Sequence, residues 1–286
     1  MRNRLFPALT IGTLLAAGTA RAQNYYAYLN GANETPTPVV TSATGVASAV
    51  LNADMTLSYY LTTQGLTGTA AHIHTGPPGV SGGIMTGLNG APAGAPTTWC
   101  GTTPVLTAPQ LNALNTAGGG LYMNVHTGAN PGGEIRGPIL LAGPLPTMSP
   151  GGCSPIGVAA PQIRWVGGPA SVTASGPFAV RVSNALSGVT AILVIGLNNG
   201  PPFPLDLQTL VGGTGPCTLL NDFLVTTALS VAGPGACDGN GSLLVPNLAT
   251  ATVGSTLYLQ WVVVEPGGPL SVPIVLSNGL NLTFQP

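Results

Sequence analysis

Positively charged side chains are scarce in this 286-residue sequence, which contains no lysine and six arginines. Three arginines fall within the first 21 residues, and the others are Arg136, Arg164 and Arg181. Against seven acidic residues, these three leave the chain after the first segment with a net charge of about −4. Because nucleic acids and anionic membrane surfaces are bound through many lysines and arginines, we expect neither as a partner.

Long hydrophobic runs are also lacking beyond the first segment. The chain begins MRNRLFPALTIGTLLAAGTARAQN, in which two arginines precede an apolar run and small residues end at Ala22. This order is typical of a secretory signal peptide, and we predict one over residues 1–22 with cleavage after Ala22. No later stretch reaches the roughly 20 apolar residues of a membrane span. We therefore expect a protein that is secreted or held at the cell surface.

The cysteines lack the C-x-x-C spacing of common metal sites. In an exported chain, four cysteines predict two disulfides, for which three pairings exist. Nearness in sequence favours one of them, and it joins Cys217 to Cys237 and Cys100 to Cys153.

Charged residues make up only 5% of the chain, whereas glycine (42) and proline (28) are abundant. Because short apolar, β-branched runs recur between the glycine and proline clusters, the composition predicts an all-β fold rather than disorder. Residues 45–53 and 56–63 are expected to form a hairpin, and residues 107–118 read as the one helix of the first half. A Pro/Gly-rich linker over residues 143–161 separates two tandem β-sandwich domains, predicted at residues 23–142 and 162–286.

All three histidines lie on the polar sides of predicted strands. Alternate residues of a strand share a face, so His72 and His74 point the same way. The same alternation places Asn124 and His126 together on the polar face of a strand over residues 121–126. If the turn that follows pairs Thr127 with Gly133, His126 lies opposite Glu134 and Asn124 opposite Arg136.

Two histidines on one strand and a third from a neighbouring strand can form a three-nitrogen site for Zn(II) or Cu(II). Glu134 is then the candidate fourth ligand, or it accepts a hydrogen bond from a liganding histidine. The alternative is that His72, His74 and His126 hydrogen-bond to turn backbone near the end of the sheet. Arg136 is expected to pair with a carboxylate, Glu134 or Glu34.

The motifs AHIH, at residues 71–74, and NVHTGANPGGEIRG, at residues 124–137, resemble the CHRD domain, named from chordin and found in exported bacterial proteins. The resemblance covers residues 25–142. It implies an Ig-like or superoxide-dismutase-like Greek-key sandwich in an extracellular setting, without a settled activity. The H-x-H pattern is also similar to the copper strand of Cu/Zn superoxide dismutases. That dinuclear site needs more histidines than the three present here.

These observations favour an exported, non-enzymatic, two-domain β protein that binds an extracellular or matrix partner, or a copper or zinc ion. The second domain is expected to be a structural or attachment module. The alternative is a small mononuclear copper or zinc metalloprotein, or a redox enzyme, that uses the same histidines. No catalytic constellation supports a hydrolase, because no G-x-S-x-G motif precedes a predicted helix.

Overall fold

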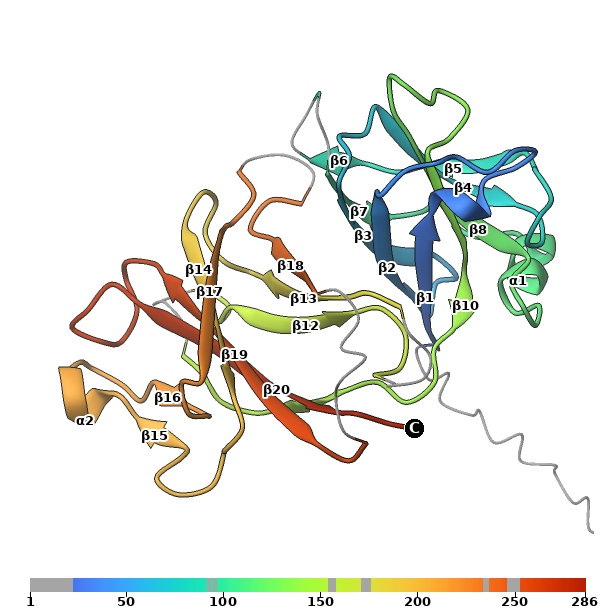
Figure 1. The fold of residues 1–286 in the computed structure, drawn as a ribbon. Helices are drawn as coiled ribbons and strands as arrows, with labels where there is room; N and C mark the ends of the chain where they lie inside the picture. Colours follow the sequence, from blue (N-terminus) through green and yellow to red (C-terminus); the bar gives the residue numbers. More distant parts are fainter. Residues whose placement is uncertain are drawn as a thin grey trace, which may run out of the picture.

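The computed structural model describes residues 23–286 except 92–93, 95–96, 154–157, 171–175, 234–236 and 246–252. The predicted signal peptide, residues 1–22, lies outside the described residues. The described chain is nearly all β and forms two bodies that lie side by side (Figure 1). The predicted all-β sandwich class is confirmed. No described helix is long and apolar enough to cross a membrane.

The first body is built on one ten-stranded antiparallel sheet, whose strands run in the order β5-β4-β8-β9-β1-β2-β3-β7-β6, with β10 also paired to β1. Its elements are β1 (Gln23–Asn30), the 3-10 helix η1 (Gly31–Asn33), β2 (Thr44–Leu51), β3 (Leu57–Gln64), β4 (Ala70–Thr75), β5 (Ile84–Gly87), β6 (Gly90–Ala91), β7 (Thr98–Thr102), α1 (Ala108–Leu114), β8 (Leu121–His126), β9 (Ile135–Pro138) and β10 (Leu140–Leu141).

This sheet curls around a single core. Leu29 of β1, Leu61 of β3, Ile73 of β4, Trp99 of β7 and Val125 of β8 belong to one cluster of buried side chains, although β4 and β7 lie near opposite ends of the strand order. Strands so far apart in one sheet can share a core only if the sheet folds back on itself. The residues that alternate with them therefore point outward, and those of β4 and β8 include all three histidines.

The predicted hairpin and helix are both confirmed. β2 pairs with β3 from Thr44↔Gln64 to Leu51↔Leu57, and the Asp54 carboxylate accepts hydrogen bonds from the amide and hydroxyl of Thr56 in the turn. α1 is shorter than predicted, because it ends at Leu114. At its start, the Gln110 side chain accepts a hydrogen bond from the Thr107 amide at 2.8 Å.

The second body packs a five-stranded sheet, in the order β11-β20-β19-β14-β17, against a three-stranded sheet, β12-β13-β18. Its elements are β11 (Thr147–Ser149), β12 (Gln162–Val166), β13 (Phe178–Ser183), β14 (Thr190–Gly196), β15 (Leu205–Asp206), α2 (Gln208–Val211), β16 (Thr218–Leu219), β17 (Val225–Ser230), β18 (Gly241–Val245), β19 (Thr256–Val264) and β20 (Val275–Thr283). The segment expected to be a linker contains β11, which pairs with β20 and so extends the larger sheet.

The disulfides are Cys100–Cys237 and Cys153–Cys217, so the pairing favoured by nearness in sequence was wrong. The two bridges span 137 and 64 residues. Nearness fails as a guide because β-sheet pairing brings together segments that are far apart along the chain. Cys100 lies on β7, so its bridge joins the first body to the second.

The two bodies also pack directly on each other. Val46 and Tyr60, on the outer faces of β2 and β3, form a buried cluster with Val166 and Ala179 of the second body. The Ser242 hydroxyl donates a hydrogen bond to the Thr62 hydroxyl at 3.1 Å. This interface and the Cys100–Cys237 bridge hold the bodies in one arrangement.

Candidate metal centre

Antiparallel pairing of β4 with β8 brings the three histidines together. The register places Ala70 opposite His126 and His72 opposite Asn124, so His72 and His126 are diagonal neighbours on one face. The Nδ1 atom of His72 lies 2.9 Å from Nε2 of His126. One ring nitrogen from each of His72, His74 and His126 lies within 4.8 Å of the other two. The three histidines therefore form a group that could hold a metal ion.

Backbone carbonyls fix two of the imidazole rings. Nδ1 of His74 is 3.1 Å from the Gly82 carbonyl oxygen, and Nδ1 of His126 is 3.0 Å from that of Pro131. A carbonyl oxygen can only accept, so both Nδ1 atoms carry the hydrogen and both Nε2 atoms keep a lone pair. A hydrogen bond from the second ring nitrogen to a carbonyl is the usual arrangement of metal-liganding histidines. The alternative expected from the sequence, hydrogen bonding to turn backbone, thus accounts for one nitrogen of His74 and one of His126. The other nitrogen of each ring stays available.

The Nε2 atom of His74 is buried and has no hydrogen-bond partner among the described residues. A buried polar atom without a partner costs about 1–3 kcal/mol of stability. A metal ion bound to this lone pair would remove that cost.

The electrostatic environment favours neutral imidazoles. Burial lowers the pKa of His72, His74 and His126 below the usual histidine value, and for His72 the neighbouring histidines lower it further. Since protonated imidazole cannot bind a metal, the lowered pKa values keep all three rings competent at neutral pH.

The spacing of the nitrogens suits a transition metal. Three imidazole nitrogens at 2.0–2.1 Å from a tetrahedral zinc ion lie about 3.3 Å apart. The observed separations, from 2.9 Å to at most 4.8 Å, bracket this value, so movements of about 1 Å would close the site. Three protein nitrogens would leave a fourth position for water or another ligand.

A stack of three side chains supports His74. The Tyr122 ring lies parallel to the His74 ring, with centroids 4.8 Å apart and planes 6° from parallel. On Tyr122 lies the Arg136 guanidinium, 3.5 Å from the ring centroid. The Tyr122 hydroxyl accepts a hydrogen bond from the Gly82 amide at 3.1 Å, the same residue whose carbonyl orients His74. Sequence reasoning missed this role of Tyr122, although strand alternation places it beside His126 and Asn124.

No salt bridge joins Arg136 to Glu134 or Glu34 in the part of the chain that the structure describes, although the charge of Arg136 acts to lower the pKa of Glu34. Its guanidinium donates hydrogen bonds to the Thr35 hydroxyl and to the carbonyl oxygens of Pro77 and Val80, the last at 2.6 Å. These bonds hold the loop that follows β4 against the stack. The guanidinium therefore serves to fasten a loop around the histidines.

Glu134 directly precedes β9 (Ile135–Pro138), and its carboxylate hydrogen-bonds to other side chains. Asn124 pairs with Arg136 as expected, and Val125 pairs with Ile135. The Glu134 carboxylate accepts hydrogen bonds from the hydroxyls of Thr41 and Thr127, at 2.8 and 2.6 Å, and from the Asn130 amide group at 3.2 Å. These bonds lower its pKa. It is not one of the residues whose ligand atoms converge, and it instead ties down the turn that carries His126.

Glu34 has a role that the sequence did not indicate. Its carboxyl group accepts a 2.6 Å hydrogen bond from the Asn124 side chain, and burial raises its pKa to about 7 despite the nearby positive charge of Arg136. Gly133 makes room for this contact, because a Cβ atom there would lie 2.4 Å from Asn124 Nδ2.

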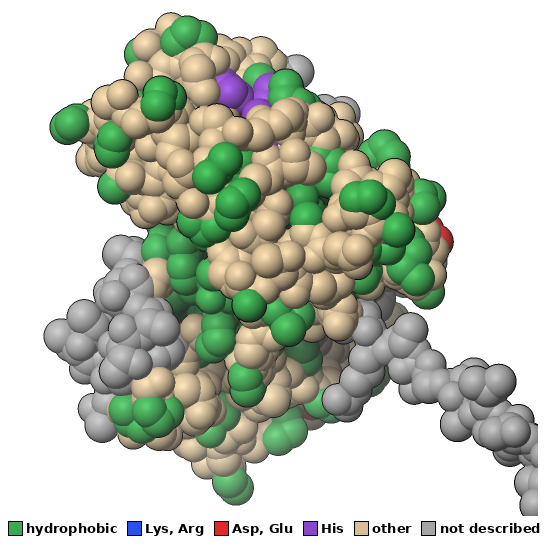
Figure 2. Space-filling model, turned by 90° about the vertical axis from the view of Figure 1, so that its right-hand side faces the viewer, with side chains coloured by type: hydrophobic (Ala, Val, Ile, Leu, Met, Phe, Trp, Pro, Cys, Tyr) green, Lys and Arg blue, Asp and Glu red, His purple; other side chains and the backbone are tan. Residues whose placement is uncertain are grey.

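The histidines are accessible from the surface of the first body, where their side chains can be seen among uncharged neighbours (Figure 2). His72 and His126 are half-buried, while His74 is buried at 9% exposure. An ion could therefore enter from solvent and meet the half-buried rings first.

A comparison with known protein families finds a match within the first body. The family model described as CHRD domain matches residues 25–139. No curated protein matches the chain. One solved structure, of a DUF4785 family protein from Legionella pneumophila, is 13% identical, with 85% of this chain and 58% of that one covered and a TM-score of 0.21. At that TM-score the likeness carries no argument about fold or function.

Proposed function

We propose that the CHRD domain formed by residues 25–139 is an extracellular metal-binding module that holds one zinc or copper ion through His72, His74 and His126. The observation that carries this proposal is the buried Nε2 atom of His74, which has no hydrogen-bond partner among the described residues and belongs to a ring that converges with the other two imidazoles. Imidazole suits both metals. The chemistry of the site therefore does not choose between them.

Metal binding would displace one hydrogen atom, the one between His72 Nδ1 and His126 Nε2. In the metal-free protein Nε2 of His126 is an acceptor, so the 2.9 Å contact requires His72 Nδ1 to donate. A bound ion takes the place of that shared hydrogen and releases a proton to solvent. The site is largely preorganised, because hydrogen bonds already fix the rings of His74 and His126 and only His72 must lose a proton.

The extracellular setting rests on three features. The first segment has the pattern of a signal peptide, and two disulfides form, which persist in oxidising compartments. A CHRD domain is the third. The second β-sandwich would then act as an attachment or spacing module for the metal-binding domain.

Equilibrium dialysis of the secreted protein against Zn(II) and Cu(II), followed by metal analysis, tests the proposal. We expect one equivalent in the wild type and none in His72→Asn or His74→Asn. Thr75→Ala is the control, because this exposed side chain follows His74 directly but points to the other side of β4. Circular dichroism of each variant checks that the fold is retained. No stoichiometric uptake by the wild type, or uptake unchanged in the folded histidine variants, would overturn the proposal.

Electron paramagnetic resonance of the copper-loaded protein adds a structural readout. Three coordinated imidazoles give a nitrogen hyperfine pattern that changes when one histidine is replaced. The same loaded sample tests the enzymatic alternative, since turnover with ascorbate and dioxygen would indicate a redox enzyme rather than a carrier or binding module.

A further inference from the structure

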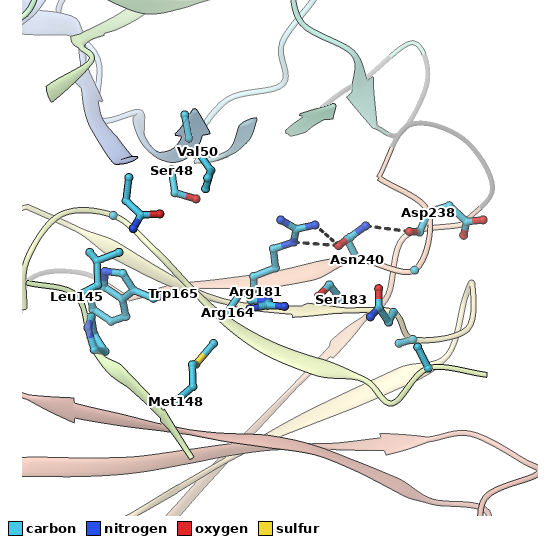
Figure 3. A pocket seen from close by; sticks show the side chains of 18 of the residues that line it. Ser48, Val50, Leu145, Met148, Arg164, Trp165, Arg181, Ser183, Asp238 and Asn240 are labelled. Carbon is cyan, nitrogen blue, oxygen red and sulfur yellow. Dashed lines mark hydrogen bonds between the residues drawn. The ribbon is translucent and has the colours of Figure 1, made fainter. Parts of the chain in front are cut away.

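A second candidate site lies between the two bodies, away from the histidines. It is a cavity of about 1060 Å³, bounded by Ser48 and Val50 of β2 on one side and by β12 and β13 of the second body on the other (Figure 3). None of the three histidines lines it. Ligand sites are common at domain interfaces, where two surfaces supply different groups.

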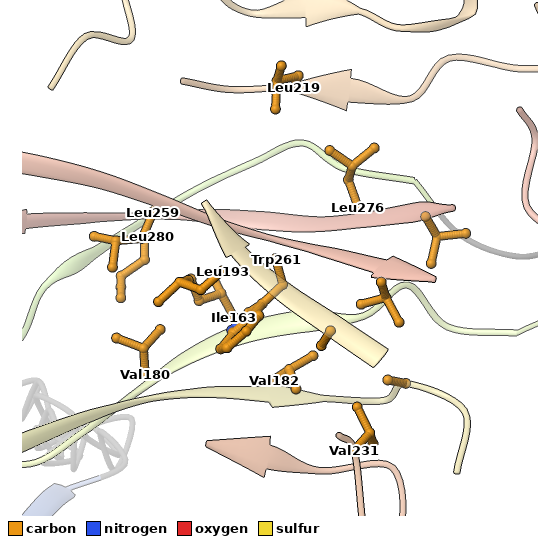
Figure 4. Close-up of a cluster of buried hydrophobic side chains, with 14 of the residues drawn as sticks. Ile163, Val180, Val182, Leu193, Leu219, Val231, Leu259, Trp261, Leu276 and Leu280 are labelled. Atoms are coloured by element: carbon orange, nitrogen blue, oxygen red, sulfur yellow. The ribbon is translucent and has the colours of Figure 1, made fainter. Parts of the chain in front are cut away.

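Two of the three arginines that follow the signal segment meet in this cavity. Arg164 of β12 lies directly opposite Arg181 of β13. On the other face of these strands Ile163 and Val180 are fully buried in the core of the second body (Figure 4), so alternation turns both arginines toward the cavity. After the signal segment the chain has only one other cationic side chain, Arg136. Its positive charge is therefore concentrated at this arginine pair.

Like charges directly opposite each other destabilise a β-sheet. Burial lowers the pKa of Arg181, and the nearby Arg164 lowers it further. The side chains that contact Arg181 are neutral: Nε donates to the Asn240 side-chain oxygen at 2.9 Å, and the guanidinium lies 4.1 Å from the Tyr60 ring centroid. No hydrogen bond or ion pair joins the exposed Arg164 guanidinium to any described residue.

Two carboxylates line the cavity, but neither forms an ion pair with the arginines in the described chain. Glu265 is buried, and its carboxylate accepts a hydrogen bond from the Leu186 amide at 3.1 Å. Asp238 lies beyond Asn240, with its carboxylate directed away from Arg181 (Figure 3). Among the residues that the structure describes, the arginine pair thus lacks a counterion, which an anionic ligand would supply.

The rest of the lining suits a polar ligand that also has an apolar face. Amides and hydroxyls surround the arginines, from Asn24, Ser48, Ser183 and Asn240. Trp165 also lines the cavity; its ring stacks on Phe178 with centroids 4.4 Å apart, and its indole nitrogen donates a 2.8 Å hydrogen bond to the Gly168 carbonyl. Hydroxyl and amide partners next to an aromatic ring are what a sugar ring requires for orientation.

The cavity wall is also held in a fixed position. Asn240 lies three residues after Cys237, whose disulfide to Cys100 attaches that segment to β7 of the first body. A site fixed before binding loses less conformational freedom when the ligand arrives.

From these contacts we infer that the cavity between the two bodies binds an acidic saccharide. Its carboxylate would lie between Arg164 and Arg181, and a sugar ring would pack against the part of Trp165 that Phe178 leaves uncovered. Arginine suits this role, because its planar guanidinium can bind a carboxylate through two parallel hydrogen bonds. The chain would then have two independent sites, one for a metal ion in the first body and one for an acidic sugar between the bodies.

Isothermal titration calorimetry with trigalacturonate tests this inference, with maltotriose as the uncharged probe and sodium sulfate as the simple anion. We expect trigalacturonate to bind and the other two to bind at least tenfold more weakly. Arg164→Gln should weaken trigalacturonate binding about tenfold or more, and Arg164→Lys should fall between it and the wild type, because lysine keeps the charge but not the fork.

As a matched control, each variant is tested with the ligand of the other site. His72→Asn should leave trigalacturonate binding unchanged, and Arg164→Gln should leave zinc uptake unchanged. Because Arg164 is exposed, its replacement is not expected to unfold the protein, and thermal unfolding verifies this. Absence of trigalacturonate binding, equal binding of maltotriose or sulfate, or affinity unchanged in Arg164→Gln would each overturn the inference.

Discussion

The side chain of Asn124 donates a 2.6 Å hydrogen bond to the carboxyl group of Glu34, which is only 6% exposed. Burial raises the pKa of Glu34 from 4.5 to about 7. The folded protein therefore holds this proton more tightly than the unfolded chain does. By linkage, this group makes the protein less stable as pH rises from about 4.5 to about 7, and its cost is constant above that range.

Glu34→Gln should remove that cost. The variant, compared with the wild type in EDTA, should gain stability as pH rises from 5 to 7 and keep a gain of about 1 kcal/mol or more at higher pH, because an uncharged side chain avoids the cost of burying the ionised carboxylate. Urea unfolding at pH 5, 6, 7 and 8 measures the difference. A variant that becomes relatively less stable toward pH 8 would show instead that Glu34 is held ionised by Arg136.

Substitution of Gly133 tests how closely the Glu34 carboxyl group packs against the turn that follows His126. Its φ angle is +133°, and a Cβ atom would lie 2.4 Å from Asn124 Nδ2 and 2.9 Å from both Glu34 oxygens. Gly133→Ala should therefore destabilise the protein by about 1–3 kcal/mol and weaken metal binding at His126. Gly128→Ala, in the same turn but with no atom within 4 Å of the added Cβ, is the control and should be nearly neutral. Equal effects of the two substitutions on urea midpoints would contradict the packing argument.

Local regularities made much of the histidine centre predictable from sequence. Strand alternation placed His72 and His74 on one face, and the short turn after His126 implied the pairing of Asn124 with Arg136. Both follow from backbone geometry over a few residues. The all-β class and the hairpin of β2 with β3 were predictable for the same reason.

Contacts between distant segments were not predictable. Glu34 and Asn124 are 90 residues apart, and Cys100 and Cys237 are 137 apart. Which of these segments meet depends on strand order in the folded sheet, and no local pattern encodes that order. For Glu134, strand register alone did not indicate that the hydroxyls of Thr41 and Thr127 hydrogen-bond to its carboxylate.

Tyr122 is expected to position His74 rather than to bind the metal. Tyr122→Phe keeps the ring between His74 and Arg136 and loses only the hydrogen bond from Gly82, so zinc affinity should stay within a few-fold of wild type. Tyr122→Leu removes the stack and should lower affinity about tenfold, the scale of groups that orient metal ligands. Competition with a zinc-binding dye measures both constants. Equal losses in the two variants would show that the hydroxyl, not the ring, controls His74.

The bridge between Cys100 and Cys237 should stabilise the arrangement of the two bodies without affecting the metal centre. It closes a loop of 137 residues, so replacing both cysteines with serine should lower the free energy of unfolding by about 2–4 kcal/mol. The interface around Tyr60 and Val166 remains, and for this reason the bodies should stay in contact at low temperature. Zinc affinity should not change, because His72, His74 and His126 belong to strands of the first body alone. Chemical unfolding and dye competition on the same preparation check both expectations, and a parallel fall in zinc affinity would mean that the second body helps to shape the histidine centre.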